Sequence, residues 1–354
     1  MSFSVDTALR KAKKHLKNEE IISAREIYRQ ILEKYPENMS AIRGYKRSTQ
    51  ISDRPDNLSL NQNDIDAVLA LFNKGLFSDA ICAILELLKN HPTSYFLYNV
   101  LGVSQANDGL LEDAEATFLL ASKFASDKSE AFTNLANIQC KIGKTDKALA
   151  NYRQALDISP NELGALNNLG SLLVEKGQYQ EAISILKRQI KIDPHQPKAF
   201  FSLSIALKSI HQMDAAINAA EQAIKLDKHF IEAYQSLGKL LIQTGRFEEA
   251  LMVLETANEL APQNPKTLSL LGLSLLDLQK FDSAHDRFIQ ALSIDGQNIE
   301  VMNNLAVSLQ TQGKIQESKK WLKKAIKIAP LDPKAYCRFA AIQALSPGHH
   351  YMKR

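Results

Sequence analysis

Few residues of this chain have the type and spacing that catalysis requires. The Gly-Lys-Thr tripeptide at 143–145 has the sequence that ends a phosphate-binding loop, but the glycine required five places before Gly143 is Ile138. His349 and His350 could contact a metal ion, yet adjacent histidines without a third ligand form a weak site. The sequence contains no cysteine pair, no His-Glu-x-x-His pattern and no nucleophile elbow. We therefore expect no catalytic residue, no metal site and no cofactor.

Three asparagines offer a different kind of chemistry, which is hydrogen bonding to a peptide backbone. Asn134, Asn168 and Asn304 stand at the sixth place of a sequence block that recurs every 34 residues. Each amide carries both a donor and an acceptor, so amides at one repeat spacing can pair with an extended peptide whatever its side chains. Other blocks carry different residues at this place: Val100, Ser202, Ser236 and Leu270. The sequence leaves open the alternative that the asparagines are simply polar residues on a helix surface.

Apolar side chains are expected between the asparagines on the same surface. Phe201 and Ile205 fall at the fifth and ninth places of their block, and Leu270 and Leu273 fall at the sixth and ninth places of theirs. These places predict side chains that line a concave groove. Exposed apolar groups in a concave surface suggest a protein partner, although packing against the adjacent block is the ordinary alternative. The predicted groove contains Asn134, Asn168, Asn304, Phe201, Ile205, Leu270 and Leu273.

Eight uninterrupted blocks of 34 residues, from Asn61 to Asp332, position these side chains. Small residues recur at the eighth place: Gly102, Ala136, Gly170, Ser204, Gly238, Gly272 and Ala306. A glycine inside a helix costs about 1 kcal/mol relative to alanine, so its recurrence predicts a neighbouring helix that leaves no room for a larger side chain. Gln189 stands where the blocks usually carry a small apolar residue. A buried amide without a hydrogen-bond partner lowers the stability of the fold, so the sequence predicts that Gln189→Ala stabilises the array.

The period of 34 residues and the alternation of small and large residues resemble the tetratricopeptide family. This resemblance implies an all-α fold, a right-handed superhelical solenoid of helix-turn-helix repeats that binds a protein or an extended peptide in its concave groove. The strings around Asn134, Asn168 and Asn304 resemble the asparagine ladder in the repeat half of O-linked N-acetylglucosamine transferases. Chaperone-binding relatives need lysine at the fifth place of the block. This chain has no lysine there, so a chaperone tail is not expected.

The chain is expected to have five parts. Ala24, Tyr28 and Pro36 match the second helix of a repeat that lies upstream and out of phase, and Pro55 marks a polar joint. An N-terminal repeat with a short following helix (1–47) is followed by a linker or joint (48–60) and by eight contiguous repeats (61–332). A C-terminal helix (333–345) and a tail (346–354) follow the repeats.

The two ends carry a narrower resemblance. Residues 8–12 and 28–32 near the start, and the Ser-Pro-Gly-His-His-Tyr-Met segment at 346–352, are similar to bacterial repeat proteins that continue into a sulfotransferase or glycosyltransferase domain. This implies an alternative function, the recruitment of substrates for such a transferase, with the catalytic domain absent from this chain or encoded as a separate subunit. No catalytic residue carries over from the resemblance.

Composition limits the classes of partner. With 45% hydrophobic and 23% charged residues the chain is typical of soluble folded proteins, and no apolar run approaches the roughly 20 residues that span a bilayer. Cys82, Cys140 and Cys337 are odd in number and far apart, which predicts reduced, buried thiols in a cytoplasmic protein. The lysines at 319–327 lack interleaved aromatic residues, so they favour a solvated face over a nucleic-acid site. We expect neither a membrane nor a nucleic-acid partner.

Overall fold

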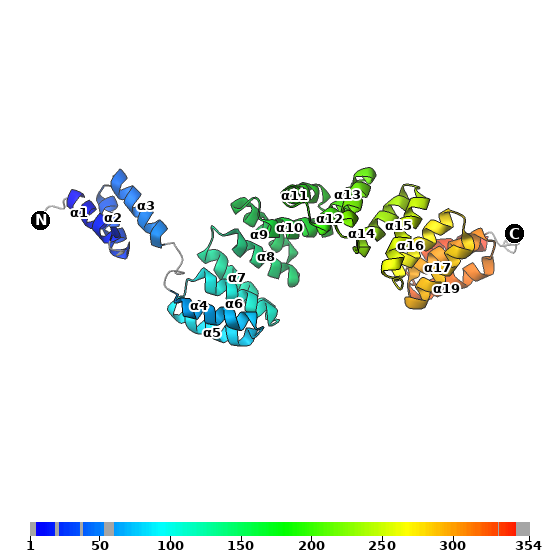
Figure 1. The fold of residues 1–354 in the computed structure, drawn as a ribbon, viewed down its shortest axis with the longest axis horizontal. Helices are drawn as coiled ribbons and strands as arrows, with labels where there is room; N and C mark the ends of the chain where they lie inside the picture. Colours follow the sequence, from blue (N-terminus) through cyan, green and yellow to red (C-terminus); the bar gives the residue numbers. More distant parts are fainter. Residues whose placement is uncertain (1–4, 18–20, 36–37, 53–59, 332, 345–354) are drawn as a thin grey trace, which may run out of the picture. The chain divides into compact units, whose positions relative to one another are not determined.

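The structure is a computed structural model that describes residues 5–17, 21–35, 38–52, 60–331 and 333–344, and every regular element within these ranges is an α-helix (Figure 1). The all-α fold of helix-turn-helix units is therefore confirmed. The helix bounds are α1 Val5–Lys17, α2 Ile21–Lys34, α3 Met39–Ser52, α4 Gln62–Asn73, α5 Phe77–Asn90, α6 Tyr95–Asn107, α7 Leu111–Phe124, α8 Ser129–Lys141, α9 Thr145–Ile158, α10 Leu163–Glu175, α11 Tyr179–Ile192, α12 Pro197–Ser209, α13 Met213–Leu226, α14 Ile231–Gln243, α15 Phe247–Leu260, α16 Pro265–Asp277, α17 Phe281–Ile294, α18 Ile299–Thr311, α19 Ile315–Ile328 and α20 Pro333–Ala344.

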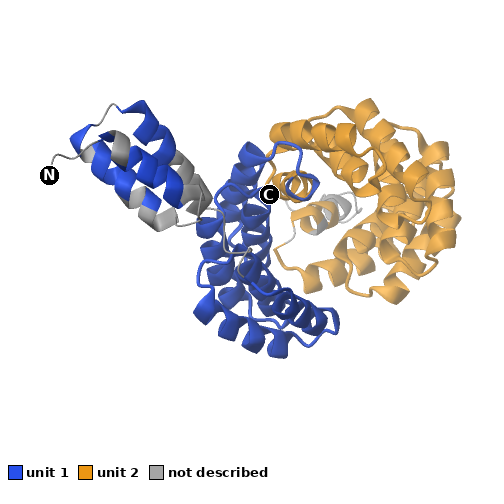
Figure 2. Cartoon of the chain, turned by 60° about the vertical axis from the view of Figure 1, so that its left-hand side comes forward, with its two compact units in different colours: residues 1–165 blue, residues 166–354 orange. Residues whose placement is uncertain are grey.

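The helices fall into two compact units, residues 1–165 and residues 166–354, which Figure 2 shows in blue and orange. Within each unit the second helix of a block packs against the first helix of its own block and against the first helix of the next. In unit 2, for example, α13 contacts both α12 and α14. From α4 onward the same repeat phase thus generates successive packed helix pairs inside each unit.

The first helices begin where the blocks begin, at residues such as Tyr95, Ser129 and Ile231. In the first block Asn61 precedes α4 and its side chain accepts a hydrogen bond from the backbone N–H of Asn63 at 3.1 Å. An asparagine at this position satisfies one of the amide groups that a helix start leaves unpaired. Block phase and helix phase therefore coincide to within one residue, although the capping residue differs from block to block.

The N-terminal helices α1–α3 have a core of their own, in which Ala24, Tyr28 and Ile31 are buried. The helix that follows the N-terminal repeat is longer than the sequence predicts. The expected joint starts at residue 48, whereas α3 continues to Ser52, because no proline or glycine stands between residues 48 and 54. The rest of the expected joint, residues 53–59, and the tail with His349 and His350 lie outside the described residues.

Small and large side chains interlock between the two helices of a block, as the sequence predicts. A Cβ atom built on Gly272 would lie 2.5 Å from a ring atom of Phe288, and one built on Gly238 would lie 2.6 Å from Leu254. These distances are below van der Waals contact, so a methyl group at Gly272 requires the fully buried Phe288 ring to move. Close approach of the paired helices explains why the eighth place stays small.

Two blocks use serine where their neighbours use glycine or alanine. The Ser204 hydroxyl donates to the carbonyl oxygen of Ala216 on the second helix at 2.8 Å, and the Ser318 hydroxyl donates to the carbonyl of Ala306 on the first helix at 2.9 Å. Both hydroxyls are fully buried, and each bond links the two helices of one block. The hydroxyl group therefore replaces a small apolar contact without leaving an unpaired polar atom.

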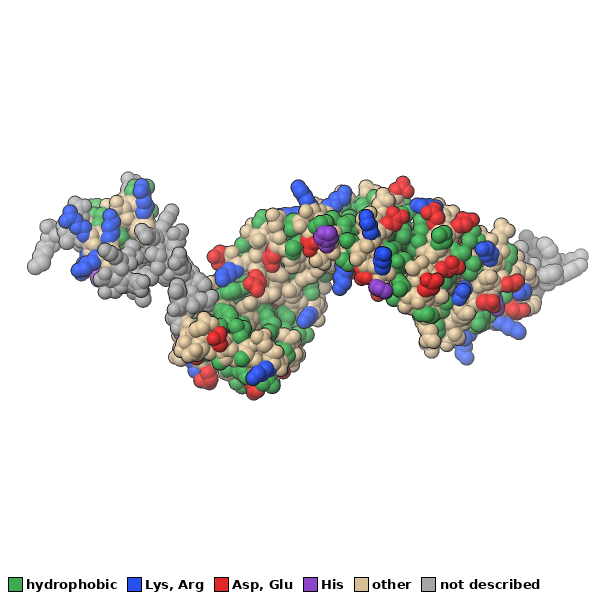
Figure 3. All heavy atoms as spheres, in the orientation of Figure 1, with side chains coloured by type: hydrophobic (Ala, Val, Ile, Leu, Met, Phe, Trp, Pro, Cys, Tyr) green, Lys and Arg blue, Asp and Glu red, His purple; other side chains and the backbone are tan. Residues whose placement is uncertain are grey.

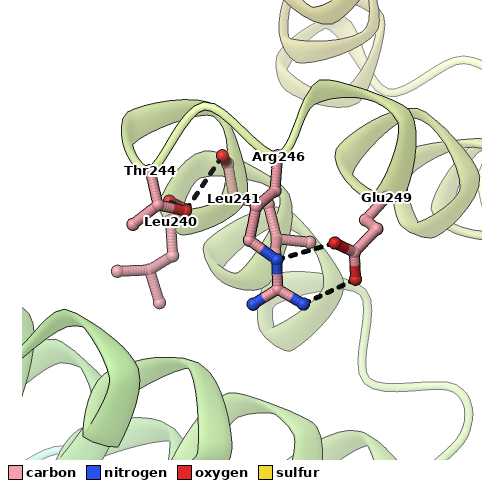
Figure 4. A network of polar contacts seen from close by, with 5 residues as sticks. All are labelled: Leu240, Leu241, Thr244, Arg246 and Glu249. Carbon is pink, nitrogen blue, oxygen red and sulfur yellow. Dashed lines mark hydrogen bonds and ion pairs between the residues drawn. The ribbon is translucent and has the colours of Figure 1, made fainter.

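The turn between paired helices is closed by local polar contacts. Gly245 has φ +76°, in the left-handed region that glycine adopts without strain. On either side of it, the Thr244 hydroxyl donates to the carbonyl of Leu240, and the Arg246 guanidinium donates to both carboxylate oxygens of Glu249 at 2.7 and 2.5 Å (Figure 4). The bidentate contact orients the start of α15 and lowers the pKa of Glu249.

Gln189 provides a test of packing at the interior of unit 2. The side chain is 2% exposed, its Nε2 donates to Asn167 Oδ1 at 3.3 Å, and its Oε1 is buried without a hydrogen-bond partner. Because the amide has one partner, truncation to alanine loses the hydrogen bond to Asn167 and leaves a cavity, and these losses offset the gain in stability that the sequence predicts.

Replacement of Gln189 by methionine keeps the side-chain volume and removes the unpaired oxygen. We expect Gln189→Met to raise the free energy of unfolding by about 1 kcal/mol. Chemical denaturation would check this value, and a lower stability than that of the wild type would contradict it.

Candidate functional site

The first helices of unit 2 form a shared surface. Helices α12, α14, α16 and α18 contact one another in succession. We call the surface made by the second, fifth, sixth, ninth and thirteenth places of these helices, and of their equivalents in unit 1, the first-helix face. The starts of α16 and α18 are fixed by Asn264 and Asn298, whose Oδ1 atoms accept from backbone N–H groups two or three residues later. The residues at the beginning of each helix are therefore held in a defined orientation.

A pocket of about 440 Å³ opens on this face and includes two residues that the sequence predicts for the groove. Leu270 and Leu273 of α16 line it together with Ile242 of α14 and Val301 of α18. We call it the α16 pocket. The other residues that line it are polar or charged. They come from the same three helices and from the residue that precedes α18: Lys239, Gln243, Lys266, Ser269, Asn298 and Glu300. The pocket thus combines an apolar centre with charged edges.

Leu270 corrects the expectation of an exposed groove residue. Its side chain is 7% exposed and packs in one cluster with Leu254 and Leu271. The reason is that α14 lies against α16 and its residue Ile242 packs in the same apolar cluster as Leu270. Leu273 at the ninth place is half-buried, which leaves it as the more accessible of the two leucines.

Phe201 and Ile205 of α12 are half-buried and lie outside the residues that line the α16 pocket. The Phe201 ring contacts Phe230, with ring centroids 5.0 Å apart and planes inclined by 53°. Phe230 is the last residue of the same 34-residue block and directly precedes α14, so the contact joins α12 to the turn that leads into α14. The structure therefore places the Phe201 ring in a contact within its own block, and its role in a groove stays a prediction.

The three asparagines lie half-buried on their first helices but differ in their contacts. In unit 1, Asn134 Nδ2 donates to Asn99 Oδ1 on the preceding first helix at 2.8 Å. In unit 2, Asn168 Oδ1 accepts from Asn167 Nδ2 at 3.1 Å. Asn304 forms no side-chain hydrogen bond within the part of the chain that the structure describes. Its amide is the most available of the three for an external ligand.

Polar groups on the first-helix face of unit 1 bond to one another. Tyr95 and Asn99 of α6 donate to the Glu130 carboxylate at 3.3 and 3.5 Å, and the Thr133 hydroxyl donates to Glu162 Oε1 at 2.8 Å. Burial and the nearby Glu130 carboxylate raise the pKa of Tyr95. These contacts were not expected from the sequence. Because these side chains already bond to one another, fewer hydrogen-bond donors and acceptors on this face of unit 1 remain for a ligand.

The face of unit 2 carries lysines that the sequence analysis missed. Lys208 of α12 is half-buried, and burial followed by the charges of Lys239 and Lys266 lowers its pKa. Among the described residues none of these three ammonium groups forms an ion pair. On the outer surface of unit 2 the basic and acidic side chains are mixed, as the view in Figure 3 shows. Lys208, Lys239 and Lys266 thus form a local group of cations, two of which line the α16 pocket.

Other candidates for chemistry have structural explanations. Gly143 has φ +79° in the turn between α8 and α9, and Lys144 pairs with Glu115 at 2.5 Å, so the tripeptide at 143–145 is a helical turn. The expectation of buried thiols is wrong for Cys82 and Cys337, which are exposed, while Cys140 is half-buried with its Sγ 3.8 Å from Tyr152 Oη.

In the described ranges, no group of three or more His, Cys, Asp and Glu side chains could hold a metal ion. No helix there has the length and apolar character needed to cross a membrane.

Comparison with protein families identifies the repeat. Models described as tetratricopeptide repeat match residues 65–129, 143–203 and 299–329, and the model for subunit 3 of the anaphase-promoting complex, or cyclosome, matches residues 209–291. All four matches lie within the array of 34-residue blocks, residues 61–332. The chain is a tetratricopeptide repeat protein. No curated protein matches its sequence.

Solved structures resemble this tetratricopeptide repeat protein in fold. A tetratricopeptide repeat protein from Parabacteroides merdae is 19% identical, with a TM-score of 0.51, and the match covers 70% of this chain and 98% of the other. Pseudomonas aeruginosa pilF is 20% identical, also with a TM-score of 0.51, over 58% of this chain and 94% of the other. At these identities the likeness concerns the helical scaffold and not a particular ligand.

Proposed function

We propose that this tetratricopeptide repeat protein binds short extended protein segments on its first-helix faces. The observation that carries the proposal is the α16 pocket, an opening of about 440 Å³ lined by side chains of three successive first helices. Surface hollows with an apolar centre and a few polar groups are the usual form of a ligand site. An extended peptide suits it, because such a segment can place one side chain in the pocket while its backbone meets amides on the same face.

Leu273 is the residue best suited to test this proposal. It lines the pocket and is half-buried, so a bound apolar side chain would cover it further. We expect Leu273→Gln to weaken peptide binding about tenfold, because burial of a leucine side chain contributes roughly 1.5–3 kcal/mol and glutamine retains only part of that contact. The measurement uses the full chain, labelled and applied to an array of short peptides of random sequence, followed by fluorescence anisotropy with the peptides that bind.

The matched control is Met252→Gln, which introduces the same side chain on the second helix α15, where Met252 is 69% exposed. This variant is expected to bind like the wild type. An array without bound peptides would contradict the proposed function, and so would equal affinities for the wild type and Leu273→Gln.

The alternative, that the chain recruits substrates for a separately encoded glycosyltransferase or sulfotransferase, stays a prediction from the sequence. It uses the same surface, because a recruited protein substrate would also be held as a segment on the first-helix faces. The array identifies the segment in either case, and the identity of the protein that contains it would then distinguish the two functions.

A further inference from the structure

The α16 pocket has charges of opposite sign on opposite walls. Lys239 stands on α14, and Glu300 stands near the start of α18, while α16, which contacts both of these helices, supplies Leu270 and Leu273 between them. Lys266 at the start of α16 lines the pocket as well. From α14 to α18 the lining therefore runs from the basic Lys239, through Lys266 and the leucines of α16, to the acidic Glu300.

The basic wall extends beyond the pocket to α12. Lys208 is half-buried there and lies near enough to Lys239 and Lys266 for their charges to affect it. These three cations form no ion pair in the described structure and repel one another. Lys239 and Lys266 are exposed, so water screens their charges, and the repulsion is strongest at the half-buried Lys208. An anion placed among them would remove the repulsion and gain attraction to all three ammonium groups.

The acidic wall imposes a second preference. Glu300 is the only carboxylate among the residues that line the pocket in the described structure. A peptide with acids on both sides of its apolar residue would place one of them near Glu300, where like charges repel. A peptide with a basic residue on that side would meet the opposite charge.

We propose that the α16 pocket selects a peptide segment in which an aliphatic residue is flanked by an acidic residue on one side and a basic residue on the other. The aliphatic side chain occupies the space between Leu273, Ile242 and Val301. The acidic residue lies over Lys239 and Lys266, and the basic residue lies beside Glu300. This specificity rests on the proposed function, since it requires that the face binds peptides at all.

The test uses the same array of random peptides and the full chain. The sequences that bind are expected to be enriched in Asp or Glu on one side of Leu, Ile or Met and in Lys or Arg on the other. We expect Lys239→Glu/Lys266→Glu to lower the affinity for such a peptide at least about tenfold and to abolish the acidic enrichment. Glu300→Lys is expected to abolish the basic enrichment and leave the acidic one.

The control is Lys187→Glu/Lys320→Glu, which changes the net charge by the same amount at exposed positions of the second helices α11 and α19. It is expected to bind like the wild type, and thermal melting of all variants checks that they are folded. Added salt should weaken the binding of the acidic peptide more than that of its Asp→Asn or Glu→Gln counterpart, because salt screens ionic attraction.

The outcomes separate the specificity from the function. Bound peptides without acidic enrichment, or an affinity that Lys239→Glu/Lys266→Glu leaves unchanged, would overturn the proposed specificity while peptide binding stands. Equal weakening by the control pair would show a general charge effect and would also overturn it. An array to which nothing binds would overturn both the specificity and the peptide-binding function.

Discussion

Replacing Phe288 by alanine is expected to lower the local free energy of unfolding by about 3–5 kcal/mol, the largest stability effect that we expect for a single side chain. The ring is fully buried and packs with Leu268, Met302 and Leu305 in one apolar core cluster of unit 2. It also covers Gly272, so its removal leaves a cavity that neither helix can close without moving. Phe288→Leu should cost much less, because the equivalent places of other blocks carry Leu186, Leu254 and Leu322.

The loss should remain local. In a repeat array each block is stabilised mainly by its neighbours, so hydrogen exchange in Phe288→Ala should rise first around residues 265–309. Hydrogen exchange is the suitable measurement, because long repeat arrays do not unfold in one all-or-none step. Ile289→Ala is the control, since Ile289 follows Phe288 on α17 and is 37% exposed. It should change stability by less than about 0.5 kcal/mol. A uniform loss of protection along the chain would contradict the expectation of local stability.

The scaffold could be predicted from the sequence because its packing rules recur in every block. Gly272 beside Phe288 and Gly238 beside Leu254 solve the same steric problem one block apart, so each block supports the interpretation of the next. The end of α3 was predicted less well. That helix is part of the upstream repeat, which is out of phase with the array, so no neighbouring block indicates where it stops.

The site was predicted only in part, because its geometry depends on how neighbouring first helices lie against each other. Leu270 was expected in the groove, but the approach of α14 to α16 buries most of it. The cluster of Lys208, Lys239 and Lys266 was missed because these residues occupy the twelfth, ninth and second places of three successive blocks. A search for one residue type at one place cannot find a cluster that crosses the helices diagonally. The contacts of α14 with α12 and with α16 bring the lysines near one another.

The asparagines should affect binding without affecting the fold. We expect the triple variant Asn134→Ala/Asn168→Ala/Asn304→Ala to lower the affinity for peptides from the array at least about tenfold. Each lost hydrogen bond contributes about 0.5–1.5 kcal/mol, and about 1.4 kcal/mol corresponds to one decade in affinity. All three positions are changed together because a short peptide can bind the first-helix face of either unit. The melting temperature should hardly change, since the three side chains are half-buried and face away from the buried seam between paired helices.

The single variants should rank in an order that follows from their contacts. Asn304 has its whole amide available in the described structure, whereas Asn134 already donates one hydrogen to Asn99. For peptides whose backbone bonds to these asparagine amides, Asn304→Ala should therefore lower the affinity more than Asn134→Ala does. The control is Gln180→Ala/Asn218→Ala/Gln222→Ala, which removes three exposed amides from second helices. Intact binding with a lower melting temperature would make the asparagines structural. The accessible side of the α16 pocket, around Leu273, would then be left to hold the peptide through its side chains alone.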